Sequence, residues 1–291
     1  TAFHAAGYLV QSFPLVSVVI PTYNRANVVS RAIRSVLSQT YKPLELIVVD
    51  DGSDDETATA LAGFSGIKTI RQKNRGVSAA RNAGIVNSHG ELVAFLDSDD
   101  EWRPEKLEKQ ISLYTPQRPL FICHSDESWM RGEKTVNQKD IHRKQGGFFF
   151  KRAVERCLIS PSAVIMARAL LDIVGLFDEE LEAAEDYDMW LRVTSSHEVD
   201  FVDEKLVIKW AGQANQLSVI TPAIDRFRVM ALQKILKIPE LPADYVCAAR
   251  DMLIQKSVIL ANGFRKRGNP VEAEFYDELA REYTTRADQS G

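Results

Sequence analysis

The chain has 291 residues, 45% of them hydrophobic and 26% charged, a composition typical of a globular protein that buries a core of its own. A formal net charge of -4 argues against a groove for nucleic acid, and three cysteines without metal-ligand spacing favour reduced thiols and a cytoplasmic location. Apolar runs stay well below the roughly 18 residues of a membrane-spanning helix, so we expect no integral span, with peripheral contact at the inner face of the membrane left open.

The start of the chain predicts an extension followed by a strand and a helix. Residues 1–14 lack the basic and apolar regions of a secretory signal. The apolar, β-branched run at 16–20 predicts a buried strand that Pro21 ends. Apolar residues at helical spacing predict a helix over 29–37, with the asparagine at 24 or 27 as its cap.

The same alternation continues to about residue 115. A strand is expected at 46–49, and Ser53 with Glu56 forms a capping-box pattern that opens a short helix. Further strands are expected at 67–70 and 92–96, and further helices at 76–86 and 104–114. This βα repeat predicts an α/β fold of Rossmann-like type, with a mainly parallel sheet flanked by helices on both faces.

Residues 116–220 have a less regular pattern. The polar and basic stretch at 129–147 has no clear period and is expected to be a long loop. Order resumes with elements at 148–157, 163–166, 168–174, 185–195 and 207–210. After Pro222 the pattern is entirely helical, with helices expected at 223–236, 243–267 and 270–286. Residues 221–291 are therefore expected to form a C-terminal helical appendage.

Acidic residues follow two of the predicted strands. Asp50 and Asp51 follow the second strand, and Asp97, Asp99 and Asp100 follow the fourth. Because ligands of open α/β sheets bind beyond the carboxyl ends of the strands, both clusters are expected to line one crevice. Carboxylates this close repel one another unless they are solvated or share a hard cation, which often also binds substrate phosphates. The sequence therefore predicts a site for a metal and a phosphate.

Five segments stand in an order and spacing found together in one enzyme family. They are residues 16–25, 49–53, 74–84, 95–102 and 185–192. In these segments the chain resembles glycosyltransferase family 2, which has the GT-A fold, and the resemblance covers about residues 15–218. It implies inverting transfer of a sugar from a nucleotide-diphosphate donor, expected to be UDP-linked, to a glycan or other hydroxyl acceptor. The nucleotide-sugar-binding half would be 15–115 and the acceptor-binding half 116–220.

The resemblance implies a donor site built around the loop after the first strand. Tyr23 offers an aromatic face on which a base could stack, an interaction of about 1–3 kcal/mol per base, with Pro21 and Arg25 beside it. Asp51 would accept a hydrogen bond from the base, and Arg81 would meet a diphosphate oxygen. The alternatives are a packing role for Tyr23, loop capping by Asp51 and a surface salt bridge for Arg81.

The segment Asp97-Ser98-Asp99 matches the family's DxD motif. Asp99 is expected to ligate Mn²⁺ or Mg²⁺ directly, Asp97 to contact the metal or the ribose, and Ser98 to line the donor site. The metal would neutralise charge on the leaving nucleoside diphosphate. Many relatives have a histidine near the end of this region as a further ligand, where this chain has Gln213. A glutamine carbonyl can ligate a hard cation, but it carries no charge and takes up no proton.

Inversion requires a base on the face of the sugar opposite the leaving group. The resemblance makes Asp186 the expected general base, with Glu185 beside it contacting the acceptor or tuning the proton affinity of Asp186. The alternative for Asp186 is an acid that stabilises a helix dipole. His124 and His142 have no partner at ligand spacing and are expected to be structural or to contact the acceptor, and Trp210 is expected in the core or in the wall of the donor pocket.

Two other functions stay open at this point. Nucleotidyl transferases use a related sheet and acidic metal ligands, but they typically carry a glycine-rich basic loop that residues 21–25 do not supply. A non-catalytic nucleotide-binding scaffold would explain Gln213, although both Asp99 and Asp186 are present. The sequence names neither the sugar nor the acceptor, because sugar epimers are distinguished by a few pocket contacts, and it leaves the oligomeric state open.

Overall fold

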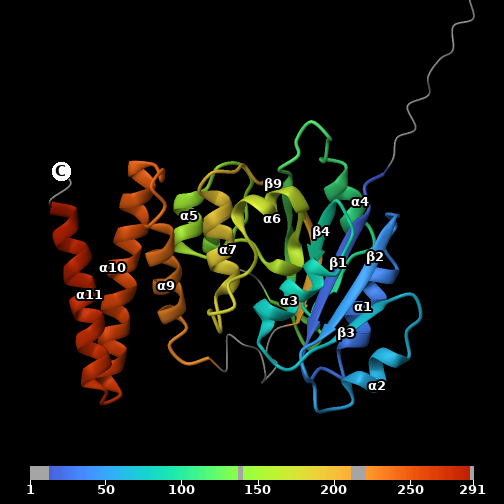
Figure 1. Ribbon diagram of the computed structural model, residues 1–291, viewed down its shortest axis with the longest axis horizontal. Coiled ribbons are helices and arrows are strands. Elements are labelled where there is room, and N and C mark those ends of the chain that lie inside the picture. The colour runs from blue at the N-terminus through green and yellow to red at the C-terminus, as the bar shows by residue number, and fades with distance from the viewer. Residues whose placement is uncertain (1–12, 137–139, 211–220, 289–291) are drawn as a thin grey trace, which may run out of the picture.

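The computed structural model describes residues 13–136, 140–210 and 221–288, and Figure 1 labels its elements. The strands are β1 (Val16–Thr22), β2 (Leu44–Asp50), β3 (Lys68–Arg71), β4 (Leu92–Phe95), β5 (Glu101–Trp102), β6 (Ile122–Arg131), β7 (Lys134–Val136), β8 (Val164–Ala167) and β9 (Asp200–Trp210). The α-helices are α1 (Val29–Leu37), α2 (Thr57–Ala62), α3 (Val77–Val86), α4 (Lys106–Ile111), α5 (Phe150–Glu155), α6 (Arg168–Val174), α7 (Glu185–Thr194), α9 (Asp225–Ile235), α10 (Ala243–Lys266) and α11 (Pro270–Asp288).

The described strands form one sheet in the order β3-β2-β1-β4-β8-β6-β9-β5, with β7 added to β6. Strands β3, β2, β1 and β4 are parallel, as the βα repeat predicts. Beyond β4 the sheet is mixed, because β8 runs antiparallel to both of its neighbours and β9 runs parallel to β6. The two predicted halves, 15–115 and 116–220, therefore share a single sheet.

Helices cover both faces of this sheet, and each face has its own hydrophobic core. In β1 the side chains of Val18 and Ile20 join one core and that of Val19 joins the other, since successive residues of a strand point to opposite faces. Residues of α1, α2 and α4 belong to the first core, and residues of α3, α5, α6 and α7 to the second. The result is a three-layer arrangement in which loops after β1, β2 and β4 meet at one edge.

The C-terminal helices α9, α10 and α11 lie at the end of the molecule away from β1, β2 and β3 (Figure 1). Their buried residues Phe227, Leu253 and Tyr276 belong to the same hydrophobic cluster as residues of α5 and α7. The helices predicted as an appendage are thus continuous with one core of the sheet domain. Within the described ranges, no helix combines the length and the apolar character that crossing a membrane requires.

The loops after β1 and β2, in which the sequence predicts helix-capping residues, are hydrogen-bonded to each other instead. The backbone N–H of Asn24 donates to Ser53 Oγ at 2.9 Å, and the N–H of Asp54 donates to Asn24 Oδ1 at 2.9 Å. Neither α1 nor α2 has a side-chain cap, so the capping box of Ser53 and Glu56 is wrong. Strand β1 also continues through Pro21, which the sequence places at its end. These contacts fix the two loops beside each other.

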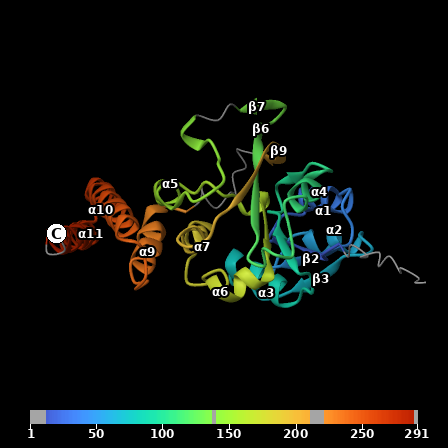
Figure 2. The ribbon, with the colours of Figure 1, turned by 90° about the horizontal axis from the view of Figure 1, so that it is seen from above.

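The polar stretch at 129–147, expected to be a long loop, contains part of a β-hairpin. Strand β6 continues to Arg131 and pairs with β7, and Figure 2 shows this hairpin projecting from the sheet. Gly132 makes the turn with a φ of 59°, a backbone conformation that glycine adopts readily. Strand β9 also begins at Asp200 rather than 207, because the exposed residues 203–205 interrupt the alternating pattern that predicts a strand.

Gly84 lets α3 lie close against β1. A Cβ atom at this position would stand 2.2 Å from Val19 Cγ1, which is far inside van der Waals contact. We expect Gly84→Ala to lower the free energy of unfolding by about 1–3 kcal/mol, the usual cost of overpacking a core, as measured by urea denaturation. Gly63→Ala is the control, because a Cβ there meets its nearest atom, Ala60 O, at 3.5 Å. Equal losses in the two variants would contradict tight packing of α3 on β1.

Candidate active site

A cleft of about 690 Å³ opens where the loops after β1, β2 and β4 face α7 and α9. It gathers ten residues that the sequence assigns to the donor site, the metal or catalysis, namely Pro21, Tyr23, Arg25, Asp51, Arg81, Asp97, Ser98, Asp99, Glu185 and Asp186. Gln213 lies outside the described residues. Pro21 and Asp186, which are 165 positions apart in the sequence, are thus brought to one site by the parallel strands and by α7.

The loops after β1 and β2 form one wall of the cleft. Tyr23 is 44% exposed and offers a ring face to a ligand. Asp51 is buried, and its carboxylate accepts hydrogen bonds from the N–H groups of Arg75 (3.0 Å) and Gly76 (2.8 Å) and from Gln72 Nε2 (2.7 Å). Asp51 therefore holds the segment that leads into α3, in addition to facing the cleft.

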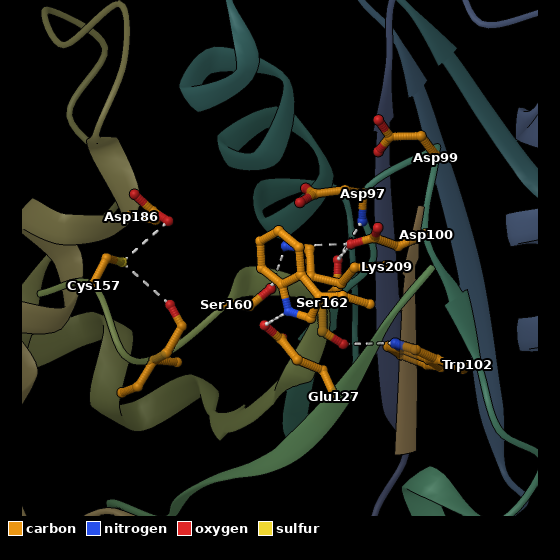
Figure 3. Close-up of polar contacts among 12 residues, drawn as sticks. Asp97, Asp99, Asp100, Trp102, Glu127, Cys157, Ser160, Ser162, Asp186 and Lys209 are labelled. Atoms are coloured by element: carbon orange, nitrogen blue, oxygen red, sulfur yellow. Dashed lines mark hydrogen bonds and ion pairs between the residues drawn. The ribbon is translucent and has the colours of Figure 1, made fainter. Parts of the chain in front are cut away.

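The acidic segment after β4 crosses the floor of the cleft (Figure 3). Burial and the nearby charge of Asp97 raise the pKa of Asp99, so this pair of carboxylates is under electrostatic strain. Asp100 points away from solvent, and its Oδ2 accepts a hydrogen bond from Ser162 Oγ at 2.6 Å. Burial raises the pKa of Asp100 to about 7, despite Lys209 Nζ at 3.6 Å from Oδ2. A bound cation would relieve the repulsion in this segment.

Arg81 of α3 is the one buried arginine that links the acidic segment to α7 within the described residues. Its Nη2 donates to Asp97 Oδ1 at 2.7 Å and its Nη1 donates to Glu185 Oε1 at 2.5 Å. The side chain is only 3% exposed, and the two carboxylates raise its pKa although burial opposes this. Arg81 is therefore no surface salt bridge, and its guanidinium is engaged by protein carboxylates rather than pointing freely at a ligand.

Asp186 faces the acidic segment from the opposite side of the cleft (Figure 3). Its Oδ1 accepts the N–H of Tyr187 at 2.7 Å, and its Oδ2 accepts a hydrogen bond from Cys157 Sγ at 3.3 Å. Ala184, just before α7, has a left-handed backbone with a φ of 57°, a strained conformation for a residue other than glycine. Burial and the charge of Asp186 raise the pKa of Glu185, against the effect of Arg81.

Three residues with reactive or charged side chains line the cleft but were not predicted as site residues from the sequence. Lys209 of β9 donates from Nζ to Ser160 Oγ at 2.9 Å and lies 5.8 Å from the ring centroid of Trp129. Cys157 lies against Asp186, and Arg228 reaches the cleft from α9. In the sequence, Lys209 is a charged residue within the apolar run at 206–210, and this position could have indicated a functional role. The helical pattern around Arg228 predicts a solvated face and gives no such signal.

Other candidate residues lie away from the cleft. His124 is fully buried between the rings of Phe149 and Phe201, and burial together with the charge of Lys144 lowers its pKa to about 3. It is therefore a structural residue. Trp210 packs under Arg31, whose guanidinium carbon lies 4.4 Å from the ring centroid. Arg31 Nη2 also donates to the backbone oxygen of Asp99 at 2.7 Å, so it holds the acidic segment in place.

The donor groups of the cleft fit a divalent cation that a substrate would help to hold. Among the described residues, no three histidine, cysteine or acidic side chains are placed to enclose an ion by themselves. Asp97 and Asp99 offer carboxylate oxygens in one cleft, and one Asp97 oxygen is already taken by Arg81. Mg²⁺ commonly binds through one or two carboxylates together with substrate phosphates, which is the arrangement these residues permit.

Comparison with known proteins identifies relatives among the glycosyltransferases. The family model described as glycosyl transferase family 2 matches residues 17–172. The chain is 35% identical over 200 residues to an uncharacterized glycosyltransferase of Rickettsia felis, covering 66% of this chain and 32% of the relative. It is 32% identical over 195 residues to the Escherichia coli UDP-Glc:alpha-D-GlcNAc-diphosphoundecaprenol beta-1,3-glucosyltransferase WfgD, covering 65% of this chain and 73% of the relative. The chain spans 32% to 63% of the length of four Rickettsia relatives.

Solved structures confirm the fold. TarS 1–349 of S. aureus in complex with UDP-GlcNAc superposes with a TM-score of 0.63 at 18% identity, covering 92% of this chain and 91% of TarS 1–349. The mannosyltransferase PcManGT of Pyrobaculum calidifontis, in complex with GDP-Man and Mn²⁺, gives a TM-score of 0.63 at 18% identity, covering 94% of this chain and 83% of that chain. The GT-A fold with C-terminal helices, expected from the sequence, is therefore confirmed.

Replacing Arg81 should destabilise the protein strongly. Arg81→Met leaves the carboxylates of Asp97 and Glu185 without their shared cation, so we expect a loss of about 3–5 kcal/mol in the free energy of unfolding. Urea denaturation followed by circular dichroism measures this loss. Arg75→Met is the matched control, because Arg75 is 62% exposed and its ion pair with Glu179 should contribute at most about 1 kcal/mol. A loss for Arg81→Met no larger than the control's would show that the bridge does not support the fold.

Proposed function

The chain belongs to glycosyltransferase family 2, and we propose that it transfers a sugar from a UDP-linked donor to a hydroxyl group of a glycan or other acceptor, with inversion at the anomeric carbon. One observation carries the proposal. The carboxylates of Asp97 and Asp99 and that of Asp186 line a single cleft from opposite sides. The name of the E. coli relative specifies UDP-Glc as donor and a lipid-linked GlcNAc as acceptor, and TarS has been solved with UDP-GlcNAc, which supports a UDP-sugar here.

We propose that the nucleotide binds along the loops after β1 and β2. The exposed ring of Tyr23 would stack on the base, and the buried Pro21 of β1 lines the cleft beside it. Asp51 can accept a hydrogen bond from the base in addition to the backbone donors it already has, because a carboxylate offers about four acceptor sites. Arg25 lies close enough to Asp99 to oppose the rise in its pKa, so it is near the expected position of the diphosphate.

Asp99 would hold a divalent cation, Mn²⁺ or Mg²⁺, with Asp97 contributing its second oxygen to the metal or to the ribose. When bound between these residues and the diphosphate, such an ion supplies Lewis-acid neutralisation of the leaving group's charge. The complex of PcManGT with Mn²⁺ supports this choice of metal. Lys209 and Arg81 offset part of the negative charge of the acidic segment, which lowers the repulsion that an anionic donor meets.

Asp186 would take the proton from the acceptor hydroxyl. The oxygen of that hydroxyl attacks the anomeric carbon from the face opposite the diphosphate, which leaves as the nucleoside diphosphate. The hydrogen bonds from Tyr187 N–H and Cys157 Sγ fix the carboxylate, and the strained backbone at Ala184 sets its direction at the start of α7. Glu185, held by Arg81, is unavailable as a second base while that ion pair persists. A single displacement of this kind gives inversion.

Alternative functions have less support. A nucleotidyl transferase would need basic groups after β1, where the loop contains Arg25 but no glycine-rich segment. A non-catalytic scaffold has no further observation in its favour.

The three cysteines are all free, and we propose a cytoplasmic location with peripheral contact at the membrane's inner face.

Removing the carboxylate of Asp99 should abolish metal-dependent donor binding. For Asp99→Asn we expect the affinity for UDP in the presence of Mn²⁺ to fall at least about tenfold, to the value measured with chelator, because a neutral amide is a much poorer ligand for a hard cation. Calorimetric titration of UDP with Mn²⁺ and then with EDTA measures this. Asp54→Asn, an exposed acid outside the cleft, should behave like the unmodified protein. Metal-dependent binding that survives in Asp99→Asn would remove Asp99 from the site.

Neutralising Asp186 should separate binding from transfer. Asp186→Asn is expected to lower kcat by about 10²- to 10⁴-fold, the usual contribution of a general base, while the Kd for UDP stays within about twofold. Release of UDP from a UDP-sugar, with a panel of acceptors and with water alone, measures turnover. Glu182→Gln, at an exposed position shortly before α7, is the control. A variant that turns over normally would exclude Asp186 as the base.

A further inference from the structure

A cluster of charged side chains joins α9 to α10 beside the cleft. Arg228 of α9 and Lys256 of α10 both reach the same atom, Asp225 Oδ1, at 3.0 Å and 2.9 Å respectively. Burial lowers the pKa of Lys256, and the charges of Arg228 and Arg156 add to this effect. Two cationic side chains thus share one carboxylate, and Arg156 lies close enough for its charge to act on Lys256.

Arg228 is the member of this cluster that lines the cleft. Its guanidinium carbon lies 5.9 Å from the ring centroid of Tyr187, the residue after Asp186. The guanidinium has five N–H donors, of which Nη1 serves Asp225 while the buried Nε has no partner in the described part of the chain. The side chain is 32% exposed, so a ligand in the cleft can reach it.

The other acids near Asp186 have cations of their own. Glu185 is paired with Arg81, and Asp188 is paired with Arg192 and Lys234. Asp186 accepts hydrogen bonds from a thiol and a backbone amide, and across the described ranges no ion pair joins it to Arg228. Arg228 is therefore not needed to balance a neighbouring carboxylate of α7.

We propose that Arg228 binds an oxyanion of the acceptor, a phosphate or a carboxylate carried close to the hydroxyl that receives the sugar. The inference rests on the proposed transferase function and specifies the class of its acceptor. Asp97, Asp99 and Asp186 would repel an anionic acceptor that entered the cleft. A cation on the side where the acceptor enters would offset this repulsion. The planar fork of an arginine suits both oxyanions, and a neutral acceptor would not require it.

Position separates this role from donor binding. The residues proposed for the donor lie on loops after β1, β2 and β4, whereas the neighbours of Arg228 are Tyr187 of α7 and Asp225 of α9. Arg228 also lies near Cys157, where its charge works against the rise of the thiol pKa that burial causes. It is thus on the side of the cleft that holds the proposed base, where the acceptor must enter.

The test measures binding of three small probes with the donor site filled. Protein saturated with UDP and Mg²⁺ is titrated with glucose 1-phosphate, glucuronate and glucose, followed by ligand-observed NMR. At least one anionic probe should bind about tenfold or more tightly than glucose, and Arg228→Gln should remove this preference. A preference for glucose 1-phosphate identifies a phosphate, and one for glucuronate a carboxylate. Asp225→Asn, which removes the carboxylate shared by the cations, should strengthen the preference.

Arg226→Gln is the matched control, since Arg226 lies on the same helix, pairs with Glu182 and is not among the residues that line the cleft. It should keep the preference. Equal binding of all three probes to the unmodified protein, or an unchanged preference in Arg228→Gln, would overturn the proposal. A fall in UDP affinity in Arg228→Gln alone would instead place this arginine in the donor site. Failure of UDP to bind the unmodified protein contradicts the proposed function, and the probes are then compared without UDP.

Discussion

The buried ion pairs of Arg81 hold the active site together. One guanidinium, 3% exposed, joins the acidic segment after β4 to the first turn of α7, and its own helix rests on β1 through the contact at Gly84. A buried cation with two carboxylate partners has a large desolvation cost, which is offset only while both partners stay in place. The separation between Asp97 and Asp186, across which we propose that the reaction takes place, is therefore tied to the packing of α3 on the sheet.

Charge in the cleft is balanced locally. Arg81 and Lys209 offset the acids of the segment after β4, Arg31 holds the backbone at Asp99, and Arg228 lines the opposite side of the cleft. Such an arrangement would let a protein of net negative charge admit the diphosphate of the proposed donor. It also leaves the repulsion between Asp97 and Asp99 in place, and that repulsion would favour the cation that we propose to bind with the donor.

Much of the donor side of this site could be predicted from the sequence, because motifs there are local. Strands followed directly by acids put Asp51 and Asp99 at the same sheet edge, and the parallel βα repeat fixes that edge. The opposite wall depends on long-range packing that no local pattern encodes. The helical pattern around Arg228 is the one expected for an arginine that faces solvent. Lys209 lies in β9, whose pairing with β6 contains irregular register shifts, so its neighbours cannot be read from the alternation of residues along the strand. The hydrogen bond between the loops at Asn24 and Ser53 is also a contact between distant parts of the sequence. The local pattern around Ser53 therefore predicted a helix cap that the structure does not contain.

Helix α9 has a consequence for how such a protein can diverge. The family-model match ends at residue 172, whereas Ile224 and Arg228, from the C-terminal helices, line the cleft beside α7. Substitutions on the face of α9 toward the cleft can alter this wall without touching β1, β2, β4 or the acidic segment. A lineage can therefore change this wall by mutating a peripheral helix, while the loops after β1, β2 and β4 are inherited intact.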